Sequence, residues 1–186
     1  KGDIVLVPNS LKHEGKLHAP EIAGLLGYFI AEGHARESKG SYKIEFTLHK
    51  DEQHIVNEIN QYTKKLFNYE GKVYTHGTGG IRLILYGKKV HSFFKKWLGE
   101  IYGKKSTAKR VPSLIFSMNQ ESQNNFIRTY LAGDAGVTKS KWLMSDLLYL
   151  YLNQEIIAGC NTRYNNHFSY IGKRKIPHKG FRFDLK

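Results

Sequence analysis

Two apolar segments of the chain, 25–33 (LLGYFIAEG) and 127–135 (IRTYLAGDA), follow the same pattern. Each holds two small residues four positions apart and ends in a carboxylate followed by a small residue. The spaced small residues are Gly27 and Ala31 in the first segment and Thr129 and Gly133 in the second. Small side chains at this spacing let two helix backbones approach closely. We therefore expect two helices packed together, with Glu32 and Asp134 at neighbouring ends.

The positions that follow the first segment predict a mixture of strands and helices. The first helix is expected to begin near Pro20, since proline suits the first helical position. Alternation of apolar and polar residues over 42–48 predicts a strand with one wet face. Its outward residues are expected to be Lys43, Glu45 and Thr47. Asp51 is the expected N-cap of the next helix, which carries an apolar stripe over 55–66.

A hairpin and a further helix complete the first half. The segments 72–76 and 81–86 flank the glycine-rich stretch 77–80, as hairpin strands flank a tight turn. The periodicity over 89–101 predicts an amphipathic helix. The basic stretch 103–110 that follows is poor in apolar residues and is the expected linker between two halves.

The second half starts with a capping-box pattern over 117–120, and Ser140 is expected to cap a second helix. Its spacing differs from that of the first half, because Asp51 follows Glu32 by 19 positions whereas Ser140 follows Asp134 by 6. The second half therefore lacks a number of residues that would be enough for one β-hairpin. Either the second sheet is reduced, or residues are missing from the sequence between Gly136 and Ser140.

The last part of the chain, from 156 to 186, has the least certain pattern. Strand-like pieces are expected at 158–164, 167–171 and 180–183. We divide the chain into an N-terminal extension (1–19), a first half (20–102), a linker (103–116) and a shortened second half (117–186).

Charge narrows the class of partner. The chain carries 29 Lys and Arg against 16 Asp and Glu, for a net charge of +13 and a pI near 9.7, which indicates a polyanionic partner. Nucleic acid is favoured over an anionic membrane, because the basic residues are not gathered on one amphipathic helix. No apolar run has the length of a transmembrane helix or a signal peptide, so we expect a soluble, intracellular protein, without a membrane partner, acting on nucleoid or organelle DNA. Cys160, the single cysteine, excludes an internal disulfide and is expected to be a small buried residue.

Glu32 and Asp134 are the candidate reactive groups. Carboxylates at neighbouring helix ends repel each other unless a cation lies between them, and oxygen ligands favour a hard ion such as Mg²⁺. Alternatively, both segments are ordinary core helices that end in exposed carboxylates. Recurrence of the pattern 102 positions later, with similar elements following each segment, favours a repeated functional unit.

The two segments resemble the paired signature motifs of the LAGLIDADG homing endonucleases in their single-chain form, found in inteins and mobile introns. The stretch 109–116 (KRVPSLIF) resembles the family's lead-in to its second motif, and the resemblance spans about residues 20–160. It implies an α+β fold of two pseudo-symmetric αββαββα-type subdomains with saddle-shaped antiparallel sheets, packed through the two motif helices. Ala135 departs from the glycine that usually ends the second motif.

The resemblance also implies roles for particular residues. Glu32 and Asp134 match the family's metal-binding acids, with the neighbouring Ala31 and Gly133 as further metal contacts, Mg²⁺ as the ion, and Mn²⁺ or Ca²⁺ as possible substitutes. Lys50, with His49 beside it, matches the position that orders the attacking water. Lys139 is the corresponding residue of the second half.

The sheet faces are expected to contact DNA bases in the major groove, which admits a two-stranded ribbon. The alternative for each residue is simple solvation or contact with phosphate. The candidates are Arg36, Lys39, Lys43, Glu45, Thr47, Lys72, His76 and Arg82 in the first half, and Arg163, Asn165, Asn166, His167, Lys173 and Arg174 in the second.

Together these expectations describe a monomeric, Mg²⁺-dependent, site-specific endonuclease that cuts double-stranded DNA and leaves short 3′ overhangs. A relative that has lost cleavage and acts as an RNA-splicing maturase or a nucleic-acid-binding regulator is the alternative. A basic RNA-binding or ribosomal protein would explain the charge but not the two acid-ended helices. We see no flanking self-splicing residues and expect the endonuclease part alone, either free-standing or cut from an intein.

Overall fold

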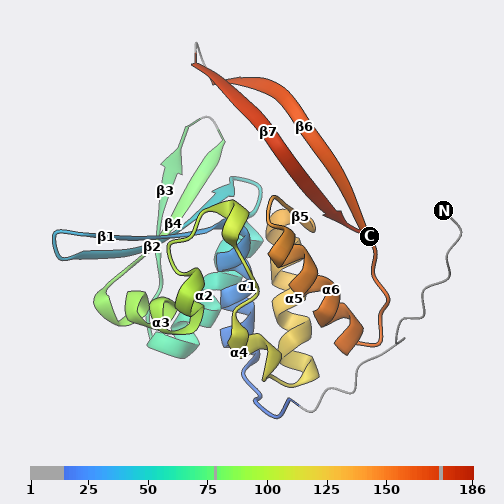
Figure 1. Cartoon of the computed structure of the whole chain (residues 1–186). Helices are drawn as coiled ribbons and strands as arrows, with labels where there is room; N and C mark the ends of the chain where they lie inside the picture. Colours follow the sequence, from blue (N-terminus) through green and yellow to red (C-terminus); the bar gives the residue numbers. More distant parts are fainter. Residues whose placement is uncertain (1–14, 78, 172–173) are drawn as a thin grey trace, which may run out of the picture.

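Two helices lie side by side at the centre of the structure, as the small-residue pattern predicts (Figure 1). They are α1 (Pro20–Glu32) and α5 (Gln120–Asp134) in a computed structural model that describes residues 15–77, 79–171 and 174–186. A Cβ added to Gly27 would lie 2.1 Å from the hydroxyl oxygen of Thr129, and one added to Gly133 would lie 2.6 Å from the Cβ of Ala31. Bulkier residues would therefore hold the helices apart.

The first half follows the predicted αββαββα order. After α1 come β1 (Gly33–Ser38), β2 (Ser41–His49), α2 (Gln53–Phe67), β3 (Lys72–His76), β4 (Gly80–Tyr86) and α3 (Lys88–Leu98), which a 3₁₀ turn extends over Gly99–Ile101. The four strands form an antiparallel sheet in the order β1-β2-β4-β3.

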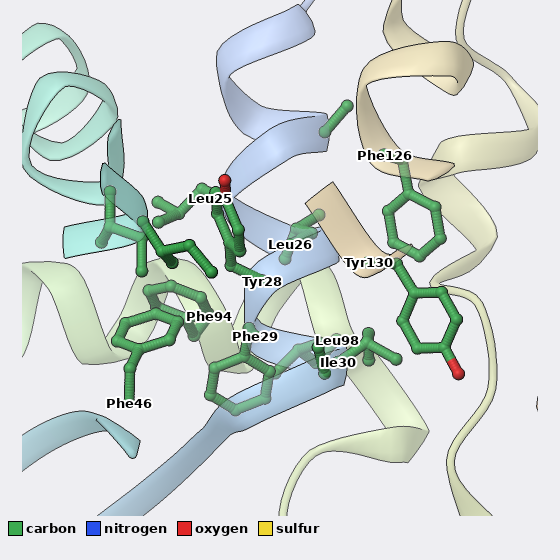
Figure 2. Packing of buried hydrophobic residues seen from close by; sticks show 14 of the residues in the cluster. Leu25, Leu26, Tyr28, Phe29, Ile30, Phe46, Phe94, Leu98, Phe126 and Tyr130 are labelled. Atoms are coloured by element: carbon green, nitrogen blue, oxygen red, sulfur yellow. The ribbon is translucent and has the colours of Figure 1, made fainter. Parts of the chain in front are cut away.

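One face of this sheet forms the core with α1, α2 and α3. The cross-strand pairs Ile44–Leu85, Phe46–Leu83 and Leu48–Ile81 are buried on that face. Phe94 of α3 packs between the rings of Phe29 and Phe46, with ring centroids 4.8 and 6.3 Å away (Figure 2). The opposite face carries the residues that alternate with this apolar set, among them Lys43, Thr47 and Arg82, as in other antiparallel sheets with one face packed on a core.

The second half is smaller than the first. A 3₁₀ turn (Ser106–Ala108) and a short helix, α4 (Ser113–Phe116), lead to α5, which is followed by β5 (Val137–Thr138), α6 (Lys141–Asn153), β6 (Cys160–Ile171) and β7 (Arg174–Leu185). Its three strands pair in the order β5-β7-β6. The α+β class and the two sheets match the prediction, but the second half has an αβαββ order and not the expected αββαββα.

Two predicted strand pieces are one strand. The expectation of separate segments at 158–164 and 167–171 is wrong, because β6 runs through Asn165 and Asn166, whose cross-strand partners on β7 are Gly180 and Lys179. The long β6–β7 hairpin projects beyond the helices (Figure 1). Cys160 is half-buried at the start of β6, not buried as expected.

Two helix caps also differ from the prediction. Asp51 does not cap α2, since Glu52 precedes its first residue and gives no side-chain cap bond. Asn119, not Ser117, caps α5, and its side chain accepts a hydrogen bond from the backbone N–H of Ser122 at 3.1 Å. Ser140 caps α6 as predicted, through the backbone N–H of Leu143.

None of the helices within the described ranges combines the length and apolar character needed to cross a membrane.

Candidate metal and nucleic-acid site

Glu32 and Asp134 are the last residues of α1 and α5, and the packing of these helices brings both carboxylates to one cavity. The cavity has a volume of about 510 Å³ and opens beside the second sheet. Its other lining residues are Ala31, Ser106, Lys109, Val137, Thr138, Lys139, Asn165, His167 and Arg182. The predicted meeting of the two acids is therefore what the structure shows.

Both carboxyl groups have raised pKa values. Burial, followed by repulsion from Asp134 and from Glu52, raises the pKa of Glu32 to about 7. Burial likewise raises the pKa of Asp134 to about 6, although the charges of Lys109 and Arg182 act to lower it. A further cation between the two carboxylates would stabilise both ionised forms.

Lys109 is one residue of this site that the sequence pattern did not mark as a candidate. Its ammonium group donates hydrogen bonds to the carbonyl oxygens of Ile30 and Ala31, the latter at 3.2 Å, at the end of α1. Burial lowers the pKa of Lys109, while Asp134 and Glu32 act to raise it. The sequence gives little indication of this role, because Lys109 is one of several lysines in a basic linker and its hydrogen-bond partners lie almost eighty positions away.

The donor set fits a divalent cation held partly by substrate. Glu32 and Asp134 supply carboxylate oxygens, which hard cations prefer, and both are destabilised when ionised without a counter-charge. Among the described residues no group of three or more His, Cys, Asp or Glu could hold a metal, so phosphate and water would complete the shell. Of the other two expected metal contacts, Ala31 already accepts from Lys109 through its carbonyl, and Gly133 packs on Ala31.

The three predicted water-positioning residues lie at different places. Lys139 lines the acid cavity. His49 and Lys50 are exposed at the end of β2, where the backbone N–H of Lys50 donates to the carbonyl oxygen of Gly79 at 2.9 Å. They do not line the cavity, although the charge of the neighbouring Glu52 acts to raise the pKa of Glu32.

The open face of the first sheet carries most of the DNA-contacting residues predicted in the first half. Strand alternation and the register place Arg36, Lys43, Glu45, Thr47, Lys72, His76 and Arg82 on this face. Lys39 lies in the turn between β1 and β2. The expectation that Glu45 is exposed is wrong, because only 6% of its surface is accessible and it forms an ion pair with Arg82.

The second sheet divides its candidates between two faces. Arg163, Asn165 and His167 share one face of β6, and two of them, Asn165 and His167, line the acid cavity. Asn166 is on the opposite face. Arg182 of β7, which the sequence analysis missed, also lines the cavity. Lys173 and the side chain of Arg174 fall outside the described residues.

Comparison with known proteins agrees with this geometry. The sequence model of a LAGLIDADG-like domain matches residues 19–98. The chain is 30% identical over 155 residues, 76% of its length, to the DNA polymerase II large subunit of Thermococcus kodakarensis. It is also 30% identical over 175 residues, 89% of its length, to the replication factor C small subunit of Methanocaldococcus jannaschii. It spans only 8% and 9% of those two proteins.

Solved structures share the fold. Mesophilic variants of the homing endonuclease I-DmoI align with 90% of this chain and 88% of theirs, with a TM-score of 0.58 and 16% sequence identity. I-DmoI in complex with DNA and Mn aligns with 90% of this chain and 89% of its own, with a TM-score of 0.55 and 17% identity. The family model therefore identifies residues 19–98 as a LAGLIDADG-like domain, and the chain shares the fold of the LAGLIDADG homing endonuclease I-DmoI.

Proposed function

We propose that this chain is a site-specific endonuclease that hydrolyses both strands of a DNA duplex with the help of a divalent metal ion. The observation that carries the proposal is the placement of Glu32 and Asp134, one from each motif helix, in a single cavity that residues of the second sheet also line. Mg²⁺ is the proposed ion, with Mn²⁺ or Ca²⁺ as substitutes. The I-DmoI complexes contain DNA with Mn or with Ca, which supports this choice.

The cavity residues have complementary tasks in this proposal. Glu32 and Asp134 hold the cation, which when bound activates water and stabilises charge on the phosphate. Lys109 and Lys139 bring positive charge to the side of the cavity next to the acids, where a scissile phosphate would be attracted. Arg182 gives a further cation from the second sheet. His49 and Lys50 remain proposed water-positioning residues, reached through the strand-to-helix junction.

The two sheets supply the duplex contacts. The residues named above on the open face of the first sheet, with Arg163, Asn165 and His167 of the second, would bind phosphates or read base edges in the major groove. Because the first sheet has four strands and the second three, the two halves of the target are expected to differ. Both acids belong to one chain, so a monomer is the proposed active unit. Short 3′ overhangs are the proposed form of the cut ends.

The relatives suggest where such a chain is found. A polymerase subunit and a replication factor share this segment although their names describe different functions, and the segment is a small part of each. This supports the proposal that the chain is a mobile element inserted in host proteins, as an intein-encoded endonuclease would be.

The test is incubation of the protein with a randomised duplex-DNA library and Mg²⁺, followed by sequencing of the cut ends. The parent chain is expected to give discrete ends with 3′ overhangs, whereas Glu32→Gln and Asp134→Asn are expected to give none. If the parent binds duplex DNA or structured RNA tightly but never cuts, the maturase or regulator function replaces the endonuclease.

A further inference from the structure

Glu45 lies buried in the open face of the first sheet, directly against Arg82. The Nε of Arg82 is 3.1 Å from the Oε1 of Glu45, and the Nη2 of Arg82 is 2.9 Å from the Nε2 of His76. The Glu45 side chain is 8% exposed and that of Arg82 is 33% exposed. The Glu45 carboxylate is therefore buried, whereas the Arg82 side chain is partly exposed at the surface of the sheet.

This arrangement fixes the direction of the guanidinium. A buried carboxylate is costly without a cation, so Glu45 keeps Arg82 folded over it. Arginine has five N–H donors in a rigid fork. Glu45 is paired with Nε by charge and not by a hydrogen bond, and His76 interacts with Nη2, so the two N–H groups of Nη1 and one of Nη2 remain for other acceptors.

The second sheet has a related arrangement, in which two arginines share one carboxylate. Arg182 donates a hydrogen bond to Asp184, whereas Arg163 is paired with Asp184 by charge alone. Asp184 of β7, whose side chain is 15% exposed, lies 3.2 Å from the Nε of Arg163 and 2.7 Å from the Nε of Arg182. Arg163 and Arg182 are direct cross-strand partners. Arg182 lines the acid cavity, whereas the side chain of Arg163 is 68% exposed. Arg163 is thus the outward arginine of this pair.

We propose that Glu45 and Asp184 are positioning residues that hold Arg82 and Arg163 for paired hydrogen bonds to guanine, one guanine in each half of the DNA target. The inference rests on the proposed function, because it assumes duplex DNA on these sheet faces. It changes the role of Glu45 from a base reader to the residue that orients one.

Guanine is the base that matches such a fork. Its O6 and N7 are adjacent acceptors in the major groove, whereas adenine presents an acceptor beside a donor at the same place. A phosphate can also accept two hydrogen bonds from an arginine fork, but that contact carries no sequence information, so a guanine preference in the bound DNA separates the two. A paired arginine contact discriminates against the wrong base by roughly 5- to 150-fold.

The test is selection of duplexes by binding from a randomised library, with the Glu32→Gln/Asp134→Asn chain as the common background so that no strand is cut. In this background two positions of the bound sequence, one in each half of the target, are expected to require guanine. Arg82→Met is expected to remove the preference at one of these positions alone, and Glu45→Ala to weaken it at the same position. Glu37→Ala is the matched control, since Glu37 is an exposed acid of the same sheet whose partner is Lys95 of α3.

A combined variant separates positioning from general electrostatics. Adding Glu45→Ala to Arg82→Met is expected to change the selected sequence no further, because Glu45 acts through Arg82. Glu45→Gln keeps the size and one acceptor oxygen, so it reports on the same position should Glu45→Ala fail to fold. Arg163→Met and Asp184→Asn are expected to act together at a second position, in the other half of the target.

The proposal is overturned if Arg82→Met and Arg163→Met select the same bases as the background, or if no duplex is enriched. It is overturned for Glu45 if Glu45→Ala and Glu45→Gln both leave the guanine preference intact. Binding is the only readout, so an absence of cleavage by the parent would count against the proposed function and not against this inference.

Discussion

Gly27 of α1 and Thr129 of α5 approach so closely that a Cβ on Gly27 would lie 2.1 Å from the Thr129 hydroxyl oxygen and 2.5 Å from the backbone oxygen of Phe126. The second of these atoms cannot move without moving the helix. The distance between the two motif helices, and with it the separation of Glu32 and Asp134, is therefore fixed by the absence of a side chain at this position.

Gly27→Ala is expected to destabilise the fold by about 1–3 kcal/mol or more, because the new methyl group overpacks the helix interface. Urea unfolding followed by circular dichroism measures the effect. Gly159→Ala is the control, since a Cβ there would lie 3.8 Å from its nearest neighbour, an ordinary contact. Equal stability of the two variants would show that the helices are less tightly packed than described.

Ala135→Gly is expected to stabilise the protein by about 1 kcal/mol. Ala135 ends α5 with φ of 44° and ψ of 29°, a left-handed conformation that costs an alanine but not a glycine. The same unfolding measurement applies, with Ala132→Gly, at an exposed position within α5, as the control of opposite sign. A loss of stability in Ala135→Gly would contradict the assigned helix end.

Lys109→Met is expected to lower the rate of cleavage by roughly a hundredfold or more, because it removes a positive charge held next to Glu32 and Asp134. Single-turnover cleavage of a duplex recovered from the library measures the rate. Lys105→Met, which changes an exposed lysine of the same linker, is expected to cut at the parent rate. A Lys109→Met chain that cuts as fast as the parent would remove Lys109 from the site.

The pH dependence of stability should report on the acid pair in metal-free protein. The pKa of Glu32 is raised from 4.5 to about 7 on folding, so below pH 4.5 the carboxyl is protonated in both states and costs nothing. As the pH rises through 7 the folded state must give up this proton, and stability is lost. Thermal unfolding in EDTA is therefore expected to show Glu32→Gln equal to the parent near pH 4.5 and more stable near pH 8.

Bound Mg²⁺ should reverse the difference in stability between the parent and Glu32→Gln near pH 8. Added Mg²⁺ is expected to raise the parent's midpoint near pH 8 and to leave Glu32→Gln little changed, because binding to the folded state adds stability. A parent and variant with parallel pH profiles would mean that Glu32 is not buried beside Asp134.

The sequence was sufficient for the parts of the fold that depend on local pattern. The small residues and terminal acids of the two motif segments predicted the α1–α5 pairing, and the alternation over 42–48 predicted the two faces of β2. Such patterns recur with the periodicity of the helix or strand that they form, so they can be recognised in one sequence without knowledge of the tertiary structure.

Features that depend on residues far apart in the sequence were missed. The burial of Glu45 follows from Arg82 on the neighbouring strand, and the place of Lys109 follows from carbonyl oxygens at the end of α1. The polar pair Asn165–Asn166 resembles a turn, yet it continues β6 because β7 supplies its cross-strand partners. In each case a tertiary contact overrides the local preference.

The central claim, that Glu32 and Asp134 form one metal centre, is tested most directly by single-turnover cleavage of a selected duplex over a range of Mg²⁺ concentrations. The parent rate is expected to rise with Mg²⁺ and saturate, whereas Glu32→Gln and Asp134→Asn should each be slower by at least about a hundredfold at any concentration. A single variant that cuts both strands at the parent rate, with the parent's Mg²⁺ dependence, would contradict the account.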